Sequence, residues 1–166
     1  MHEERLIALL ILTDWYQRGD YVLKKKIYRI YFSNLRYINN WDLVDLTAEK
    51  IIGDYLCDKD KKILVKLAKS RKLFKRRIAI MSTFNYIKKG RYGETLKISK
   101  LLIDDREDLI HKAVGWMLRE VGKRCSESIL DNFLKKHYKF MPRTMLRYSI
   151  ERMPRKKRLA YLKGLI

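Results

Sequence analysis

The sequence of 166 residues predicts an all-α protein, an α-solenoid of short helical repeats that is curved and carries a basic concave face. Three observations predict this fold class. Apolar residues recur at the three- and four-residue spacing of amphipathic helices, and no segment alternates as a strand does. Only 2 prolines and 7 glycines interrupt the chain. The helical segments are short and follow one another in pairs, as in a helical bundle or a solenoid.

Turn and capping residues mark the first helices. Gly19 and the aspartate after it separate two predicted helices, residues 3–18 and 21–38, because glycine and aspartate favour turns and helix starts. Asn40 opens a third helix, since an asparagine side chain accepts hydrogen bonds from the free N–H groups of a first turn. The polar residues 57–61 end this helix. The whole chain is expected to contain about ten helices.

The later part of the chain continues in the same way. Glycines within residues 88–94 form a turn, and Ser126 follows a long helix and opens the next. Pro142 and Pro154 each suit the first turn of a short helix, where no backbone N–H is needed. The predicted helices are residues 73–89, 95–104, 109–124 and 129–139, with one short helix after each proline.

Three residues that are unusual for a plain core recur at similar spacing. Asp45, Arg77 and Trp116 are 32 and 39 positions apart, and each lies on the longer helix of a successive pair. HEAT-like repeats are about 40–47 residues long. One such residue in each repeat would line up along one surface. The spacing therefore favours a single domain of HEAT-like repeats over residues 1–166.

The chain is strongly basic. It has 39 Lys and Arg residues against 19 Asp and Glu residues, so its formal charge is +20. A field of this size favours a polyanionic partner, with nucleic acid first and an anionic membrane surface second. No apolar run approaches the ~20 residues that span a bilayer. We therefore expect a cytoplasmic monomer with no membrane contact and no obligatory protein partner.

The sequence contains none of the common catalytic or cofactor motifs, neither a Walker loop nor a GxGxxG segment nor a nucleophile–base pattern. Cys57 and Cys125 have no CxxC companion, and the three histidines have no neighbour at metal-ligand spacing. We expect free thiols, no metal and no cofactor. Any chemistry must then come from a carboxylate, an arginine and aromatic side chains.

Asp45 is the least expected residue of the third helix. It lies on the apolar stripe that begins at Trp41, one turn after this tryptophan, where capping no longer accounts for a charge. Because the two are four residues apart, their side chains share a face. One interpretation is a core tryptophan beside an aspartate held by an arginine. The other is a binding site for a cationic group, which both a ring face and a carboxylate attract.

Arg77 borders the apolar stripe between Phe74 and Met81. A guanidinium makes forked hydrogen bonds to phosphate, so a phosphate clamp is one hypothesis. A structural partner for Asp45 is the other, and the two are compatible.

Trp116 lies off the apolar stripe of its helix and is flanked at helical spacing by Lys112 and Arg119. A large aromatic side chain on a basic flank fits contact with nucleic acid, with partial burial between repeats as the alternative. The predicted DNA-binding set is Trp116, Arg77, Lys112, Arg119 and Arg143.

Four segments resemble one known family, the DNA alkylation repair glycosylases of the AlkD type, which are built from HEAT-like repeats. They are "NNWDLVD", "RRIAI", "HKAVGWMLREVGKR" and "MPRTMLRYSIERMP", and the similarity runs over nearly the whole chain. The resemblance implies active-site positions at Trp41, Asp45, Arg77 and Trp116, with Trp41, Asp45 and Arg77 as the catalytic set. Members of the family usually carry one or two further helices before this region. We therefore expect that the chain is either naturally short or a fragment.

The resemblance also implies an activity, the excision of positively charged alkylpurines such as 3-methyladenine and 7-methylguanine from double-stranded DNA in base excision repair. A cationic base already leaves readily, so the enzyme has to stabilise the oxocarbenium-like sugar, which a carboxylate does electrostatically. The alternative is a non-catalytic HEAT-repeat module that binds nucleic acid. A protein-binding scaffold is a third hypothesis, which the charge of +20 disfavours.

Overall fold

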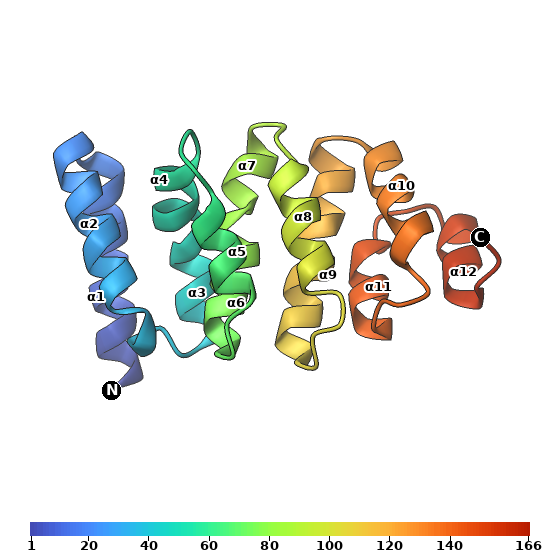
Figure 1. The fold of residues 1–166 in the computed structure, drawn as a ribbon, viewed down its shortest axis with the longest axis horizontal. Helices are drawn as coiled ribbons and strands as arrows, with labels where there is room; N and C mark the ends of the chain where they lie inside the picture. The colour runs from blue at the N-terminus through green and yellow to red at the C-terminus, as the bar shows by residue number, and fades with distance from the viewer. The chain divides into compact units, whose positions relative to one another are not determined.

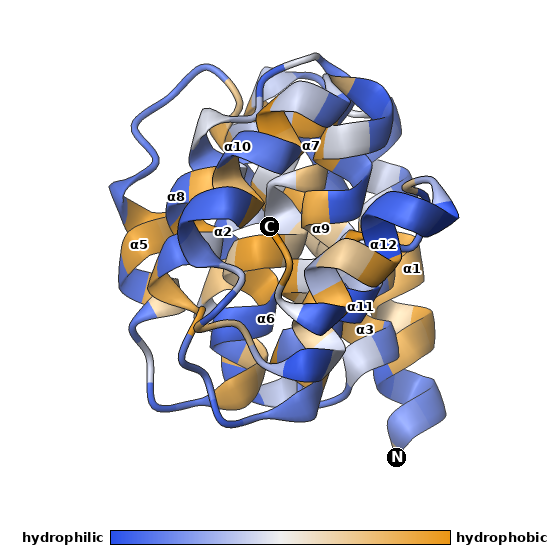
Figure 2. Ribbon diagram, turned by 90° about the vertical axis from the view of Figure 1, so that its right-hand side faces the viewer, coloured by the Kyte–Doolittle hydropathy of each residue, from blue (hydrophilic) through white to orange (hydrophobic).

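The computed structural model describes all 166 residues and contains helices and no strands, which confirms the all-α prediction. The chain divides into two compact units, Met1–Asn85 and Tyr86–Ile166. The arrangement of the helices as one solenoid domain of HEAT-like repeats stays a prediction. None of the helices combines the length and the apolar character that a bilayer span requires. Most connecting loops are hydrophilic, and the hydrophobic residues lie mainly on the helices (Figure 2).

In the first unit, helices that follow one another in the sequence pack against one another. Helices α1 and α2 lie side by side, α3 packs against α1, and α6 packs against both α3 and α5 (Figure 1). The elements are α1 (His2–Arg18), α2 (Tyr21–Ser33), η1 (Leu35–Tyr37), α3 (Trp41–Ala48), η2 (Glu49–Gly53), α4 (Asp54–Leu56), α5 (Lys62–Ala68) and α6 (Leu73–Ser82).

The predicted capping residues occupy the predicted helix starts. The backbone N–H of Leu23 donates to Asp20 Oδ1 at 2.8 Å, and the N–H of Trp41 donates to Asn40 Oδ1 at 2.8 Å. The helix that Asn40 opens continues through α3, η2 and α4, and η2 is a π-helical turn. Such turns carry one extra residue and are frequent at functional sites.

The helix predicted over residues 73–89 is interrupted. It ends at Ser82 and resumes as α7 (Phe84–Lys88), because the hydroxyl of Thr83 donates to the carbonyl of Ile80 at 2.7 Å and competes with the helical hydrogen bonds. Periodicity alone did not indicate this break.

The second unit is built around its longest helix, α9 (Asp108–Arg124). It contacts three neighbours, and its contact with α11 is the most extensive in the protein. Gly115 makes this closeness possible, since a Cβ there would lie 2.5 Å from Cβ of Tyr148. Pro142 and Pro154 immediately precede α11 and α12, close to their predicted places. The neighbours are α8 (Gly93–Leu101), α10 (Glu127–His137) and α11 (Arg143–Ser149), and α12 (Arg155–Lys163) follows.

Candidate functional site

Asp45 and Arg77 form a forked ion pair between α3 and α6. Nε of Arg77 donates to Oδ1 of Asp45 at 2.8 Å, and Nη2 donates to Oδ2 at 2.7 Å. The side chain of Arg77 is 5% exposed and that of Asp45 is 13% exposed. The structure therefore brings together two of the predicted catalytic residues, in the arrangement that the structural-partner hypothesis for Arg77 describes.

A close backbone contact fixes the spacing of the two helices. Gly53 lies at the end of η2, and a Cβ there would lie 2.3 Å from the carbonyl oxygen of Ser82. Ser82 is fully buried at the end of α6, and its hydroxyl donates to the Ile78 carbonyl at 2.7 Å. Because only glycine allows this approach, Gly53 brings the helix of Asp45 against the helix of Arg77.

Trp41 begins α3 and is 52% exposed, so it lies at the surface end of the stripe and is not a core residue. Its helical turn is attached to α1 through the next residue, since His2 Nε2 and Asp42 Oδ2 lie 2.8 Å apart. An exposed indole one turn before Asp45 remains available for contact with a ligand.

The pair as a whole is neutral, but it holds the Asp45 carboxylate in one orientation close to the surface. Both oxygens of Asp45 accept a hydrogen bond from the guanidinium, the forked geometry in which arginine binds a carboxylate. The two hydrogen bonds restrict rotation of the carboxylate, and 13% of the Asp45 side chain stays exposed. Such a group is suited to attract a positive charge with little reorganisation.

Three predicted DNA-binding cations of the second unit already have partners. Lys112 pairs with Asp108 at 2.7 Å across one helical turn, and Arg143 donates to the carbonyl of Leu162 at 2.7 Å. These contacts are exposed and can be exchanged for phosphate at small cost. The hydrogen bond from Lys112 lowers the pKa of Asp108.

Arg119 differs from these two cations, because its side chain is only 17% exposed and is bound to Glu151. A second carboxylate, that of Glu120, lies 3.7 Å from Nη2 of Arg119. Trp116, on the same helix, is half-buried. To bind phosphate directly, Arg119 would have to give up its partly buried ion pair with Glu151. The spacing of residues in the sequence did not indicate this pair.

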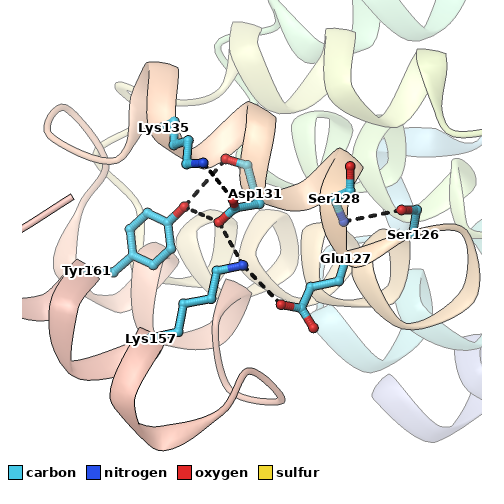
Figure 3. Close-up of polar contacts among 7 residues, drawn as sticks. All are labelled: Ser126, Glu127, Ser128, Asp131, Lys135, Lys157 and Tyr161. Atoms are coloured by element: carbon cyan, nitrogen blue, oxygen red, sulfur yellow. Dashed lines mark hydrogen bonds and ion pairs between the residues drawn. The ribbon is translucent and has the colours of Figure 1, made fainter.

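Helix α12 is fastened to α10 by a polar cluster (Figure 3). Tyr161 donates to Oδ1 of Asp131 at 2.6 Å, and Lys157 pairs with Asp131 and Glu127 at 3.0 Å each. Burial alone would raise the pKa of Asp131, but hydrogen bonds from Tyr161, Lys135 and Lys157 lower it to about 2. The Asp131 carboxylate therefore remains ionised over the whole neutral range.

The family comparison adds to this geometry. A family model described as DNA alkylation repair enzyme matches residues 1–153. The chain belongs to this family. Membership in the DNA alkylation repair enzymes implies an enzymatic role in DNA repair with DNA as the substrate. No curated protein and no solved structure matches the chain.

The matched region of this DNA alkylation repair enzyme contains every predicted site residue, among them Trp41, Asp45, Arg77 and Trp116. The structure contains no group of three or more His, Cys, Asp or Glu side chains placed to hold a metal ion, and neither cysteine forms a disulfide. The predicted set lacked the positioning residue Gly53. Its signal in the sequence is a lone glycine inside a helical pattern, which often marks close packing but does not name the partner.

Proposed function

We propose that the chain is a DNA glycosylase of the AlkD type, which excises positively charged alkylated purines from double-stranded DNA. The substrates are bases of the 3-methyladenine and 7-methylguanine kind. The observation that carries the proposal is the Asp45 carboxylate of a DNA alkylation repair family member. It is held by a forked pair with Arg77, and its side chain stays 13% exposed.

The proposed reaction breaks the bond between C1′ of the deoxyribose and the alkylated base. The bonding electrons leave with the base and neutralise its positive charge, while positive charge develops on the sugar. The Asp45 carboxylate stabilises this developing charge. Water then adds to C1′ and loses a proton, leaving an abasic site and a free base.

The roles of the neighbouring residues follow from their burial. Arg77 positions the carboxylate, since its guanidinium is already forked onto Asp45. A direct contact of Arg77 with phosphate stays a prediction. Trp41 and Trp116 pack against the deoxyribose and its neighbours in this proposal, which suits the exposed indole of Trp41. Lys112 and Arg143 supply DNA-binding charge directly, whereas Arg119 contributes through its pair with Glu151.

The proposal includes the arrangement of the helices and the way the enzyme works in the cell. The successive helical pairs form a solenoid of HEAT-like repeats with a basic concave face, and the protein acts in the cytoplasm as a monomer without a cofactor. The spacing of Asp45, Arg77 and Trp116 along the chain supports the repeats.

A non-catalytic module that binds nucleic acid is the second candidate. The observation in its favour is the Asp45–Arg77 pair itself, because the pair joins α3 and α6 whether or not it takes part in catalysis. In that case the charge of +20 supplies DNA affinity without chemistry.

The deciding experiment incubates the protein with duplex DNA containing 7-methylguanine and measures the released base by chromatography. Asp45→Asn, prepared in parallel, is the control for contaminating glycosylases. Release by the unaltered protein that is lost in Asp45→Asn supports the glycosylase. Normal binding of the duplex with no release supports the non-catalytic module.

A further inference from the structure

A basic pocket lies between α11 and α12, within the second unit. Its volume is about 470 Å³, and its wall includes the guanidinium-bearing side chains of Arg143, Arg147 and Arg158. Tyr148 and Glu151 also line it. All three arginines are exposed and line the same hollow, so their combined positive charge attracts an anion to it.

The positive charge of this pocket is not neutralised from within. Arg147 and Arg158 take part in no ion pair or side-chain hydrogen bond, and Arg143 donates to a neutral backbone carbonyl. The one carboxylate in the wall, that of Glu151, is bound by Arg119 from α9. Arg119 therefore offsets the negative charge of Glu151, which would otherwise repel an anion from the pocket.

The surrounding helices hold the pocket residues in place. The close contact at Gly115 holds Cβ of Tyr148 and the backbone carbonyl of Met145 against α9. On α12, Lys157 and Tyr161 face α10 through the cluster of Figure 3. Two residues of α12 line the pocket, Arg158 and Leu162. They directly follow Lys157 and Tyr161, the residues that bind α10. One face of α12 is therefore bound to α10, and the neighbouring face carries the Arg158 guanidinium into the pocket wall.

We propose that this pocket binds a backbone phosphate of the DNA strand, and this inference rests on the proposed function for the identity of its partner. Forked guanidinium groups match phosphate oxygens in charge and shape, and the Tyr148 hydroxyl can donate a further hydrogen bond. No base edge is read by these groups, so the contact is independent of sequence. A terminal phosphate would meet the same chemistry, and the experiment separates the two sources.

The test compares two double variants that lose the same charge. Arg147→Ala/Arg158→Ala empties the pocket of its unpaired cations. Arg155→Ala/Lys156→Ala is the matched control, because both residues are exposed on α12 and lie outside the pocket. Binding is measured by fluorescence anisotropy over a range of salt concentrations. The probe is an undamaged dumbbell duplex, which has no strand ends, and a linear duplex with 5′-phosphates is the second probe.

On the dumbbell, the pocket variant should bind about tenfold more weakly, with a log–log salt slope less steep by about 1, as expected for one lost phosphate contact. The control should change affinity by about twofold or less. Thermal melting checks the fold, and Arg147→Gln/Arg158→Gln, which keeps much of each side chain, replaces the alanine pair if that variant unfolds.

Three other results would contradict the assignment of the pocket to a backbone phosphate. A loss confined to the linear duplex assigns the pocket to a terminal phosphate and overturns the backbone assignment. Equal losses in the pocket variant and in the control mean that only the diffuse charge matters, which refutes the inference alone. Failure of the unaltered protein to bind either duplex refutes the proposed function and this inference with it.

Discussion

Replacing Asp45 with asparagine separates the catalytic from the structural role of the ion pair only if stability is measured too. Asparagine keeps the size of the side chain and one acceptor oxygen but removes the charge. Arg77, 5% exposed, is then left without its carboxylate. Removing one member of a buried pair costs about 3–5 kcal/mol, and the remaining amide oxygen reduces this to roughly 2–3 kcal/mol. Asp45→Asn should therefore be both less stable and less active.

A double-mutant cycle resolves this ambiguity. Arg77→Met leaves Asp45 as the uncompensated charge and should also lower stability. The double variant, Asp45→Asn/Arg77→Met, leaves no buried charge and should recover a large part of the loss, with a coupling energy of about 1–3 kcal/mol. It should not recover activity, because the carboxylate that stabilises the sugar cation in the proposed reaction is still absent.

The measurements are urea unfolding of the four proteins and single-turnover release of 7-methylguanine at a temperature where all four are folded. In both variants that lack the carboxylate, release should fall by on the order of 10²-fold or more, the usual effect of losing a preorganised electrostatic group. Arg77→Met should lose less, because the carboxylate remains but is no longer oriented. A folded double variant that releases base at the normal rate would end the catalytic assignment of Asp45.

Three further predictions concern the surroundings of the two sites. Gly53→Ala should destabilise by about 1–3 kcal/mol in urea unfolding, because its Cβ would meet a carbonyl oxygen at 2.3 Å, whereas Gly93→Ala, with nothing within 4 Å, should not destabilise. Asp131 has a pKa lowered from 3.8 to about 2, so the stability it supplies is present above pH 4 and lost as the pH falls to 2. The difference in melting temperature between the unaltered protein and Asp131→Asn should shrink over that interval, and a constant difference would contradict this. Arg119→Ala should weaken DNA binding, and adding Glu151→Gln should restore it; no restoration would mean that Arg119 binds phosphate directly.

The helix starts and the unusual residue of the site could be predicted because both are local features. Asp20 and Asn40 cap the helices that they were expected to open, since capping depends on a few adjacent residues. Asp45 was recognised because a charge on an apolar stripe departs from helical periodicity. The sequence does not decide whether Arg77 pairs with Asp45 or binds phosphate, since a separation of 32 residues does not determine a contact.

The features that sequence reasoning missed depend on how helices pack. The contact between Gly53 and Ser82 joins two helices whose mutual approach no pattern encodes. The pairing of Arg119 with Glu151 likewise connects residues 32 positions apart. Trp41 belongs to an apolar stripe by spacing but is 52% exposed, because it occupies the first position of α3, where the neighbouring helices do not cover it.

The Asp45–Arg77 pair is poor evidence for a purely structural role. The cost of removing two charges from water approaches the gain from their attraction, so an apolar pair of similar size would join α3 and α6 at least as well. What an apolar pair cannot supply is a negative charge held at one orientation, with 13% of its side chain open to a ligand. A reaction that develops positive charge on a sugar needs that feature and little else, since the cationic base leaves without strong acid catalysis. Functional sites tolerate the energetic cost of burying such a pair. A contact that only joins two helices would gain no stability from it over an apolar pair.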